Sequence, residues 1–165
     1  MTRPTASRVK EALFNILPYD LSGSAVLDLF AGAGNLTLEA LSRGAATAIL
    51  VDWSFEAGKA IRENLRRLQL TDRAKVWIMP ATRALRLLAR HGDTFDIIFL
   101  DPPYDRQWID RTLRIIAQER LLRASGTVIA EHSIREEVEP TYDSLVLHDQ
   151  RRYGSTLVSF FKQAG

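Results

Sequence analysis

The chain has 165 residues, of which 46% are hydrophobic and 25% are charged, and it contains no cysteine. This composition is typical of one soluble domain that buries a core without disulfide or metal support, so residues 1–165 are expected to form a single domain. The lack of cysteine excludes thiolate catalysis, zinc ribbons, iron–sulfur clusters and disulfides. The three histidines do not stand at metal-ligand spacing, and no metal site is expected.

The charge is nearly balanced, with 22 Lys and Arg against 20 Asp and Glu, which excludes a histone-like polycation. The arginines are dispersed, a pattern that allows a phosphate-binding face but is also typical of solvated helices. No apolar run reaches the roughly 20 residues that cross a bilayer, and the first residues lack the apolar stretch of a signal peptide. These features predict a cytoplasmic protein that does not enter membranes.

The predicted elements begin with a helix over residues 7–17, in which Ser7 is the N-cap and Pro18 follows the last turn. Short apolar runs then alternate with amphipathic segments, which is typical of a parallel sheet with crossover helices. The strands are expected at 25–30, 47–52, 75–79, 95–100 and 126–132, and the helices at 35–43, 54–68, 81–90 and 107–119.

Two further strand-like runs, residues 143–150 and 155–162, are separated by the short segment 151–154. This spacing predicts a C-terminal antiparallel hairpin. The whole pattern indicates an α/β fold, with about seven strands in a mostly parallel sheet and helices on both faces.

The sequence DLFAGAG (residues 28–34) follows the first predicted strand and opens a helix. Gly32 and Gly34 allow a sharp turn and a close approach of the backbone to a ligand, and Asp28 lies where a strand meets the crevice. The third position of a dinucleotide fingerprint is Thr37, which disfavours a pyrophosphate. A tight turn without function is the alternative.

Asp52 ends the second predicted strand. A carboxylate at this position can accept hydrogen bonds from both ribose hydroxyls, as in dinucleotide folds. The alternative is a carboxylate that stabilises the helix N-terminus beside Ser54 without any ligand. Together with the glycine loop, we favour the ribose role.

The tetrapeptide Asp101-Pro102-Pro103-Tyr104 follows the fourth predicted strand. Neither proline has an amide donor, so the carbonyls and the Asp101 carboxylate form an edge of acceptors. Such an edge can orient an exocyclic amine, and Tyr104 offers a stacking face for a flipped base. Ordinary turn chemistry and packing are the alternative.

These motifs, in this order, resemble the class I S-adenosylmethionine-dependent amino-methyltransferases, which have a Rossmann-like fold. Three further segments narrow the resemblance: RPTASRVKEALFN (residues 3–15), LEALSRGA (38–45) and RYGST (152–156). Over nearly the whole chain, the sequence is similar to the bacterial 16S rRNA guanine-N2 methyltransferase family of the RsmD type.

The resemblance implies transfer of a methyl group from S-adenosylmethionine to a guanine N2 amine, with 16S rRNA or the small ribosomal subunit as partner. The segment 1–20 would cover the cleft. The cofactor site would comprise Thr5 near the cofactor carboxylate; Asp28, Phe30, Ala31, Gly32 and Gly34 at the methionine end; Asp52 at the ribose; Trp53 beside the adenine; and backbone groups near Ala81. The catalytic residues would be Asp101, Pro102, Pro103 and Tyr104, and Arg3 and Arg8 would meet RNA phosphates.

The sequence departs from the family pattern in three places. Pro80 stands where relatives often have an Asp or Asn that binds the adenine amine, Ser7 stands where an Asp is expected, and Met1 precedes the opening motif by only two residues. We expect adenine to be recognised through backbone groups, because proline has no side-chain acceptor. Longer relatives carry a basic, glycine-rich segment ahead of the opening motif, so the resemblance does not extend to substrate docking.

Three other functions fit parts of the sequence: methylation of adenine N6 in DNA or of a protein glutamine, a non-catalytic RNA-binding or assembly module, and an NAD oxidoreductase. The first usually shows Asn before the two prolines, and the last is disfavoured by Thr37. Trp77, Trp108 and His132 are interpreted as structural residues, with Trp108 packed on the sheet at a helix start.

Overall fold

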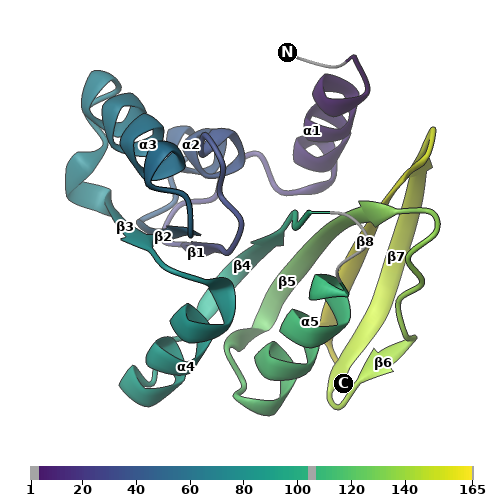
Figure 1. Cartoon of the computed structure of the whole chain (residues 1–165). Coiled ribbons are helices and arrows are strands. Elements are labelled where there is room, and N and C mark those ends of the chain that lie inside the picture. The colour runs from purple at the N-terminus through teal and green to yellow at the C-terminus, as the bar shows by residue number, and fades with distance from the viewer. Residues whose placement is uncertain (1–3, 104–106, 165) are drawn as a thin grey trace.

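In the part of the chain that the structure describes, eight strands form one sheet with helices on both faces (Figure 1). The structure, a computed structural model, describes residues 4–103 and 107–164, and the side chains of these ranges from Arg8 onward. The strands are Ala25–Asp28 (β1), Thr47–Asp52 (β2), Ala74–Ile78 (β3), Phe95–Leu100 (β4), Leu122–Ser133 (β5), Thr141–Tyr142 (β6), Leu145–Tyr153 (β7) and Thr156–Gln163 (β8). The helices are Pro4–Ile16 (α1), Asn35–Ser42 (α2), Phe55–Arg67 (α3), Ala81–His91 (α4) and Trp108–Gln118 (α5), with a 3-10 turn at Thr71–Arg73 (η1).

The strand order is β3-β2-β1-β4-β5-β8-β7-β6. Strands β1 to β5 pair in parallel, whereas β8 pairs antiparallel with both β5 and β7. The reversal of order at β1 and β4 creates a crevice at the carboxyl ends of the parallel strands. The predicted α/β class and the C-terminal hairpin are confirmed, with eight strands in place of about seven.

Two cores lie on opposite faces of the sheet. On one face, apolar side chains of α1, α2 and α3 pack against Val26, Ile97, Phe99, Ile129 and Val158. On the other face, α4 and α5 pack against the alternate residues of the same strands. Because successive strand residues point to opposite faces, the face that each polar residue at a strand end occupies follows from its neighbours.

The first helix begins earlier than predicted. It starts at Pro4 and not after Ser7, so the prediction of Ser7 as an N-cap is wrong. Proline fits the first turn of a helix, because its ring presets φ and its missing N–H has no partner there. The helix ends at Ile16, close to the predicted end.

The C-terminal strands also differ from the predicted bounds. Residues 151–153 continue β7 and pair with β8, so the turn lies at Gly154, whose φ is +61°. Strand β5 begins at Leu122 because this residue already pairs with Phe95, although the polar segment 123–125 hides the strand in the sequence. The two-residue strand β6 was not predicted, since two residues carry no periodicity.

Candidate functional site

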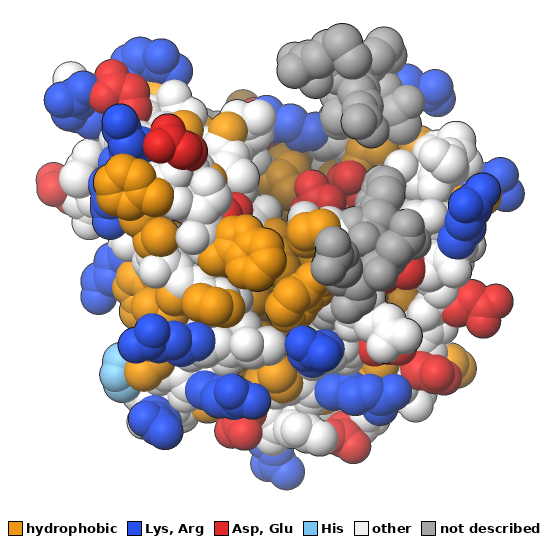
Figure 2. Space-filling model, viewed as in Figure 1, with side chains coloured by type: hydrophobic (Ala, Val, Ile, Leu, Met, Phe, Trp, Pro, Cys, Tyr) orange, Lys and Arg blue, Asp and Glu red, His pale blue; other side chains and the backbone are white. Residues whose placement is uncertain are grey.

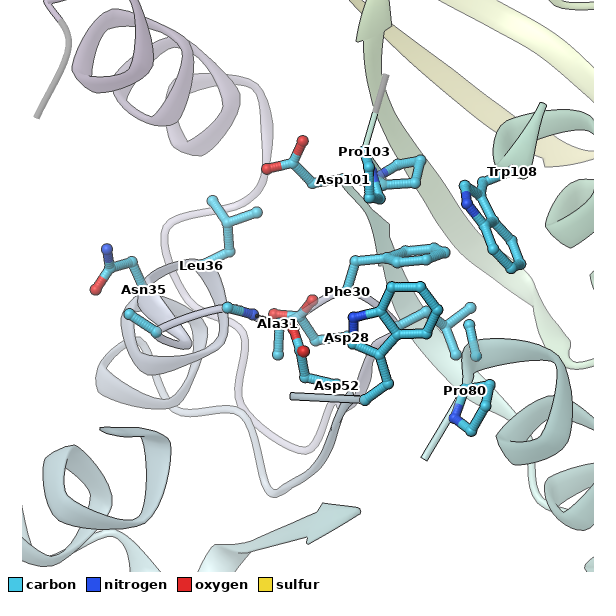
Figure 3. Close-up of a pocket in the computed structure, with 16 residues that line it drawn as sticks. Asp28, Phe30, Ala31, Asn35, Leu36, Asp52, Pro80, Asp101, Pro103 and Trp108 are labelled. Atoms are coloured by element: carbon cyan, nitrogen blue, oxygen red, sulfur yellow. Dashed lines mark hydrogen bonds between the residues drawn. The ribbon is translucent and has the colours of Figure 1, made fainter. Parts of the chain in front are cut away.

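A cavity of about 430 Å³ opens at the carboxyl ends of β1, β2 and β4. Figure 2 shows hydrophobic side chains gathered around a hollow that holds acidic groups, and Figure 3 shows the lining residues. The lining comprises Asp28, Leu29, Phe30, Ala31, Gly32, Ala33, Asn35, Leu36, Asp52, Trp53, Pro80, Ala81, Asp101, Pro102, Pro103 and Trp108.

Most residues of the predicted site therefore meet in one place. Gly34 and Arg8 are not among the lining residues, and Arg8 is exposed on α1. Arg3 and Tyr104 lie outside the described residues, and Thr5 belongs to α1 but its side chain is not described. The roles assigned to Arg3, Thr5, Arg8 and Tyr104 remain predictions.

Asp28 ends β1 on the face that carries α2, and its side chain is buried. The Thr37 hydroxyl donates a hydrogen bond to Asp28 Oδ2 at 2.8 Å. Burial raises the pKa of Asp28 to about 7, although the hydrogen bonds from Thr37 and the Phe30 amide act in the opposite direction. The residue that breaks the dinucleotide fingerprint thus has a defined task, which is to hold this carboxyl group.

Asp52 is fixed by two backbone amides from different loops. The amide of Gly32 donates to Oδ2 and the amide of Ser54 donates to Oδ1, each at 2.9 Å. Ser54 in turn caps α3 by accepting from the Ala57 amide. Asp52 therefore both accepts a hydrogen bond at the start of α3 and lines the cavity. Each carboxylate oxygen keeps a further lone pair for a ligand hydroxyl.

Gly34 shapes the loop from outside the cavity. It adopts a left-handed conformation at the N-cap of α2, and a Cβ atom there would lie 3.1 Å from Leu50 Cδ2. Gly32 also has positive φ, but a Cβ atom there would meet nothing within 4 Å. The loop thus needs glycine at position 34 both for φ and for packing.

Asp101 follows β4 and stands beside Glu131 of β5, a residue that the sequence interpretation missed. Leu100 and Ala130 are register partners, so the residues that follow them are neighbours across the two strands. Their side chains share a hydrogen bond. The pKa of Asp101 is raised to about 8, first by desolvation and then by the charges of Glu131 and Asp28, even though part of the residue is exposed at the cavity mouth.

An aromatic group forms one wall of the cavity. The Trp108 ring contacts Phe30 at 6.0 Å and Trp53 at 6.4 Å between centroids, both edge to face. Trp108 was predicted to pack on the sheet, and this is incomplete because it lines the cavity beside Pro103 (Figure 3). A tryptophan at a helix start looks the same in sequence whether it faces a core or a ligand.

The charged residues of the cavity lining are all acidic: Asp28, Asp52 and Asp101, with no Lys or Arg among the described lining residues. Such a lining favours a ligand that carries positive charge and disfavours the phosphates of a dinucleotide. The prediction against a pyrophosphate, made from the glycine spacing, thus gains an electrostatic reason.

His132 has the structural role that its sequence context favoured. It is fully buried, with Nε2 placed 2.8 Å from the Ser159 hydroxyl and Nδ1 placed 2.9 Å from the Glu136 carbonyl. Burial lowers its pKa. Trp77 is partly buried and packs against the core on the α4 face.

Within the described ranges, no group of three or more His, Asp or Glu side chains is placed to hold a metal ion. No helix of the same ranges is long and apolar enough to cross a membrane.

Comparison with known proteins identifies the family of this chain. The family described as "Conserved hypothetical protein 95" matches residues 1–162. The protein named "Putative rRNA methyltransferase YlbH" of Bacillus subtilis is 41% identical over 99% of this chain and 89% of its own length. The chain belongs to this family.

A curated relative and a solved structure similar to this chain have names that describe an activity. Ribosomal RNA small subunit methyltransferase D of Escherichia coli is 29% identical over 98% of this chain and 79% of its own length. The solved structure titled "Putative methyltransferase yhhF from Escherichia coli" superposes with a TM-score of 0.84 at 30% identity, covering 99% of this chain and 88% of that chain. The RsmD-type family predicted from the sequence motifs is thereby confirmed.

Proposed function

We propose that the protein transfers a methyl group from S-adenosylmethionine to the exocyclic N2 amine of a guanine in 16S rRNA. The observation that carries the proposal is the acidic cavity next to the Asp101-Pro102-Pro103 edge. The sulfonium of the cofactor is cationic, and the cavity offers carboxyl groups without a described basic residue in its lining. The names of the relatives support an rRNA substrate.

The described residues fit the parts of this cofactor. S-adenosylmethionine supplies an activated methyl group when bound. The Asp52 carboxylate, held by two amides, suits the ribose hydroxyls, and Gly32 leaves open space beside it for close approach of a ligand. Asp28 lies deeper, where its carboxyl group suits the methionine end. Trp53, which is 65% exposed, is available to flank the adenine.

The target amine would meet the edge after β4. Pro102 and Pro103 contribute carbonyl acceptors and no amide donors, and Asp101 adds a carboxyl group. These acceptors orient the two N–H donors of the amine and stabilise the positive charge that its nitrogen gains during attack. The chain thus acts by positioning and electrostatics. Tyr104, beyond the described residues, is proposed as the stacking face for the base.

Basic side chains outside the cavity suit a polyanion. Figure 2 shows Lys and Arg side chains gathered beside the apolar rim of the hollow. Helices α1, α4 and α5 present exposed arginines that take part in none of the ion pairs found in the described ranges: Arg8, Arg83, Arg86, Arg90, Arg111 and Arg114. Contacts of this kind bind phosphates without reading sequence.

The test is transfer of labelled methyl from S-adenosylmethionine to small ribosomal subunits that lack native base methylation, followed by digestion to nucleosides. Label is expected in N2-methylguanosine. Asp101→Ala should lose turnover far more than cofactor affinity, whereas Asp52→Ala should lose cofactor affinity first. Asp72→Ala, an exposed carboxylate on η1, is the matched control and should behave as the unchanged protein.

Two results would contradict the proposal. Label in N6-methyladenosine or in protein would show a different amine as the substrate. Cofactor binding without transfer to any of these would favour a binding or assembly module with the same fold.

A further inference from the structure

Three carboxyl groups lie on the same face of the sheet at the ends of three adjacent strands. Strand alternation places Asp28, Asp101 and Glu131 on the face that α1 covers, because the residues before each of them belong to the opposite core. The order β1-β4-β5 makes Asp101 the central member. Asp28 accepts a hydrogen bond from the Thr37 hydroxyl. The side chains of Asp101 and Glu131 share a hydrogen bond with each other.

Among the side chains that the structure describes, few positive charges lie near this pair. Across the sheet, Glu131 is the register partner of Val158 on β8, which in turn is the register partner of Arg151 on β7. Arg151 is exposed and forms an ion pair with Asp149. On α1, Lys10 reaches Glu39 instead, and Arg8 is exposed. No described ion pair includes Asp101 or Glu131.

Two ionised carboxylates in hydrogen-bonding contact repel each other, so a shared proton is the stable arrangement. A carboxyl group that carries a proton, however, is a weaker acceptor for an amine N–H and has lost the negative charge that would stabilise the positive charge developing on the nitrogen. We propose that Asp101 and Glu131 hold one proton between them, and that Glu131 takes this proton when the target amine binds, so that Asp101 presents a carboxylate to the amine. This inference rests on the proposed function.

The proton balance follows directly. On amine binding, one proton passes from Asp101 to Glu131 and none enters or leaves the pair. As the N–C bond forms and the C–S bond breaks, the bonding electrons of the C–S bond remain on sulfur and the nitrogen becomes positive. The nitrogen then releases one proton to the Asp101 carboxylate. The pair holds two protons at that point and returns one to water. Glu131 is a positioning residue in this scheme, since it acts through Asp101.

The first test needs no methyl transfer. The carboxyl carbons of Asp and Glu are labelled with ¹³C, and Asp101 is titrated by NMR in the free protein, with Asp101→Asn used to assign its signal. Two titration steps are expected for Asp101 in the unchanged protein, because the two groups titrate as a pair. A single step between these two is expected in Glu131→Gln. A single Asp101 step that Glu131→Gln leaves unmoved would overturn the inference.

The second test is the pH dependence of kcat/KM for methyl transfer, which reports groups of the free enzyme. In Glu131→Gln the acid limb should move by about one pH unit to higher pH, which gives about a tenfold loss at the acid end, while activity at high pH stays within a few fold. Glu131→Asp should restore the original limb. A uniform loss at every pH would indicate a purely structural role and would overturn the inference.

The outcomes separate the two proposals. If the unchanged protein transfers no methyl group to guanine, the proposed function fails while the NMR titration still decides whether the proton is shared. If transfer occurs, but Glu131→Gln changes neither the NMR titration of Asp101 nor the acid limb of the kcat/KM profile, only the shared-proton inference fails.

Discussion

Replacing Trp108 with alanine removes the centre of the aromatic wall. The Trp108 ring touches Phe30 at 6.0 Å and Trp53 at 6.4 Å, so its loss also releases the exposed Trp53. Stacking of a base on an aromatic side chain is worth about 1–3 kcal/mol by alanine substitution. For an adenine stacked on this wall, the dissociation constant of the cofactor product should rise by about 5- to 150-fold.

The assay is isothermal titration calorimetry with S-adenosylhomocysteine. Trp108→Phe keeps an aromatic ring and should retain most of the affinity. Trp77→Ala is the matched control, because it removes the same side chain from β3 outside the cavity lining and should change stability but not affinity. The reasoning is refuted if Trp108→Ala binds within twofold of the unchanged protein, or if Trp77→Ala weakens binding equally.

Two further predictions concern stability. Gly34→Ala should cost about 1–2 kcal/mol for its left-handed backbone and about 1–3 kcal/mol more for the contact with buried Leu50. Gly23 has a similar φ and open space around it, so Gly23→Ala should cost only the first amount. Gly34→Ala should therefore have the lower melting temperature in thermal unfolding. Equal melting temperatures would contradict the packing argument. The raised pKa of Asp28, about 7 against an ordinary 3.8, means that the folded protein binds the proton more tightly than the unfolded chain, so this group's stabilising contribution is complete below about pH 4 and is lost as the pH rises to about 7. Asp28→Asn should remove this loss and gain stability relative to the unchanged protein between those pH values in urea unfolding; parallel pH curves would show that the Asp28 pKa is not raised.

The acidic residues at the carboxyl ends of the strands could be predicted from the sequence, because each ends or follows an apolar run. Asp28, Asp52 and Asp101 each end or follow such a run in the sequence, and parallel pairing brings all three to one edge of the sheet. The predicted elements also survive with small shifts of their bounds, because short apolar runs alternate with amphipathic segments of helix length along the sequence. Local sequence patterns are thus sufficient to locate most of the cavity.

The missed residues depend on contacts between distant segments. Glu131 lies inside a strand as a single acidic residue, and only the pairing of β4 with β5 brings it to Asp101. Trp108 lies 78 positions after Phe30 in the chain, and the contact between their rings arises from the packing of α5. A local sequence pattern cannot predict a contact between residues so far apart in the chain.

The placement of β8 has a consequence for the order in which the protein can fold during synthesis. Strand β8 lies between β5 and β7 although it follows both in the chain. Until the ribosome has made β8, β5 has an open edge and β7 has no neighbour to join it to the parallel strands. An open edge is a template for wrong pairing. Because Val158 of β8 is the register partner of Glu131, the nascent chain can complete this side of the site only when β8 has emerged.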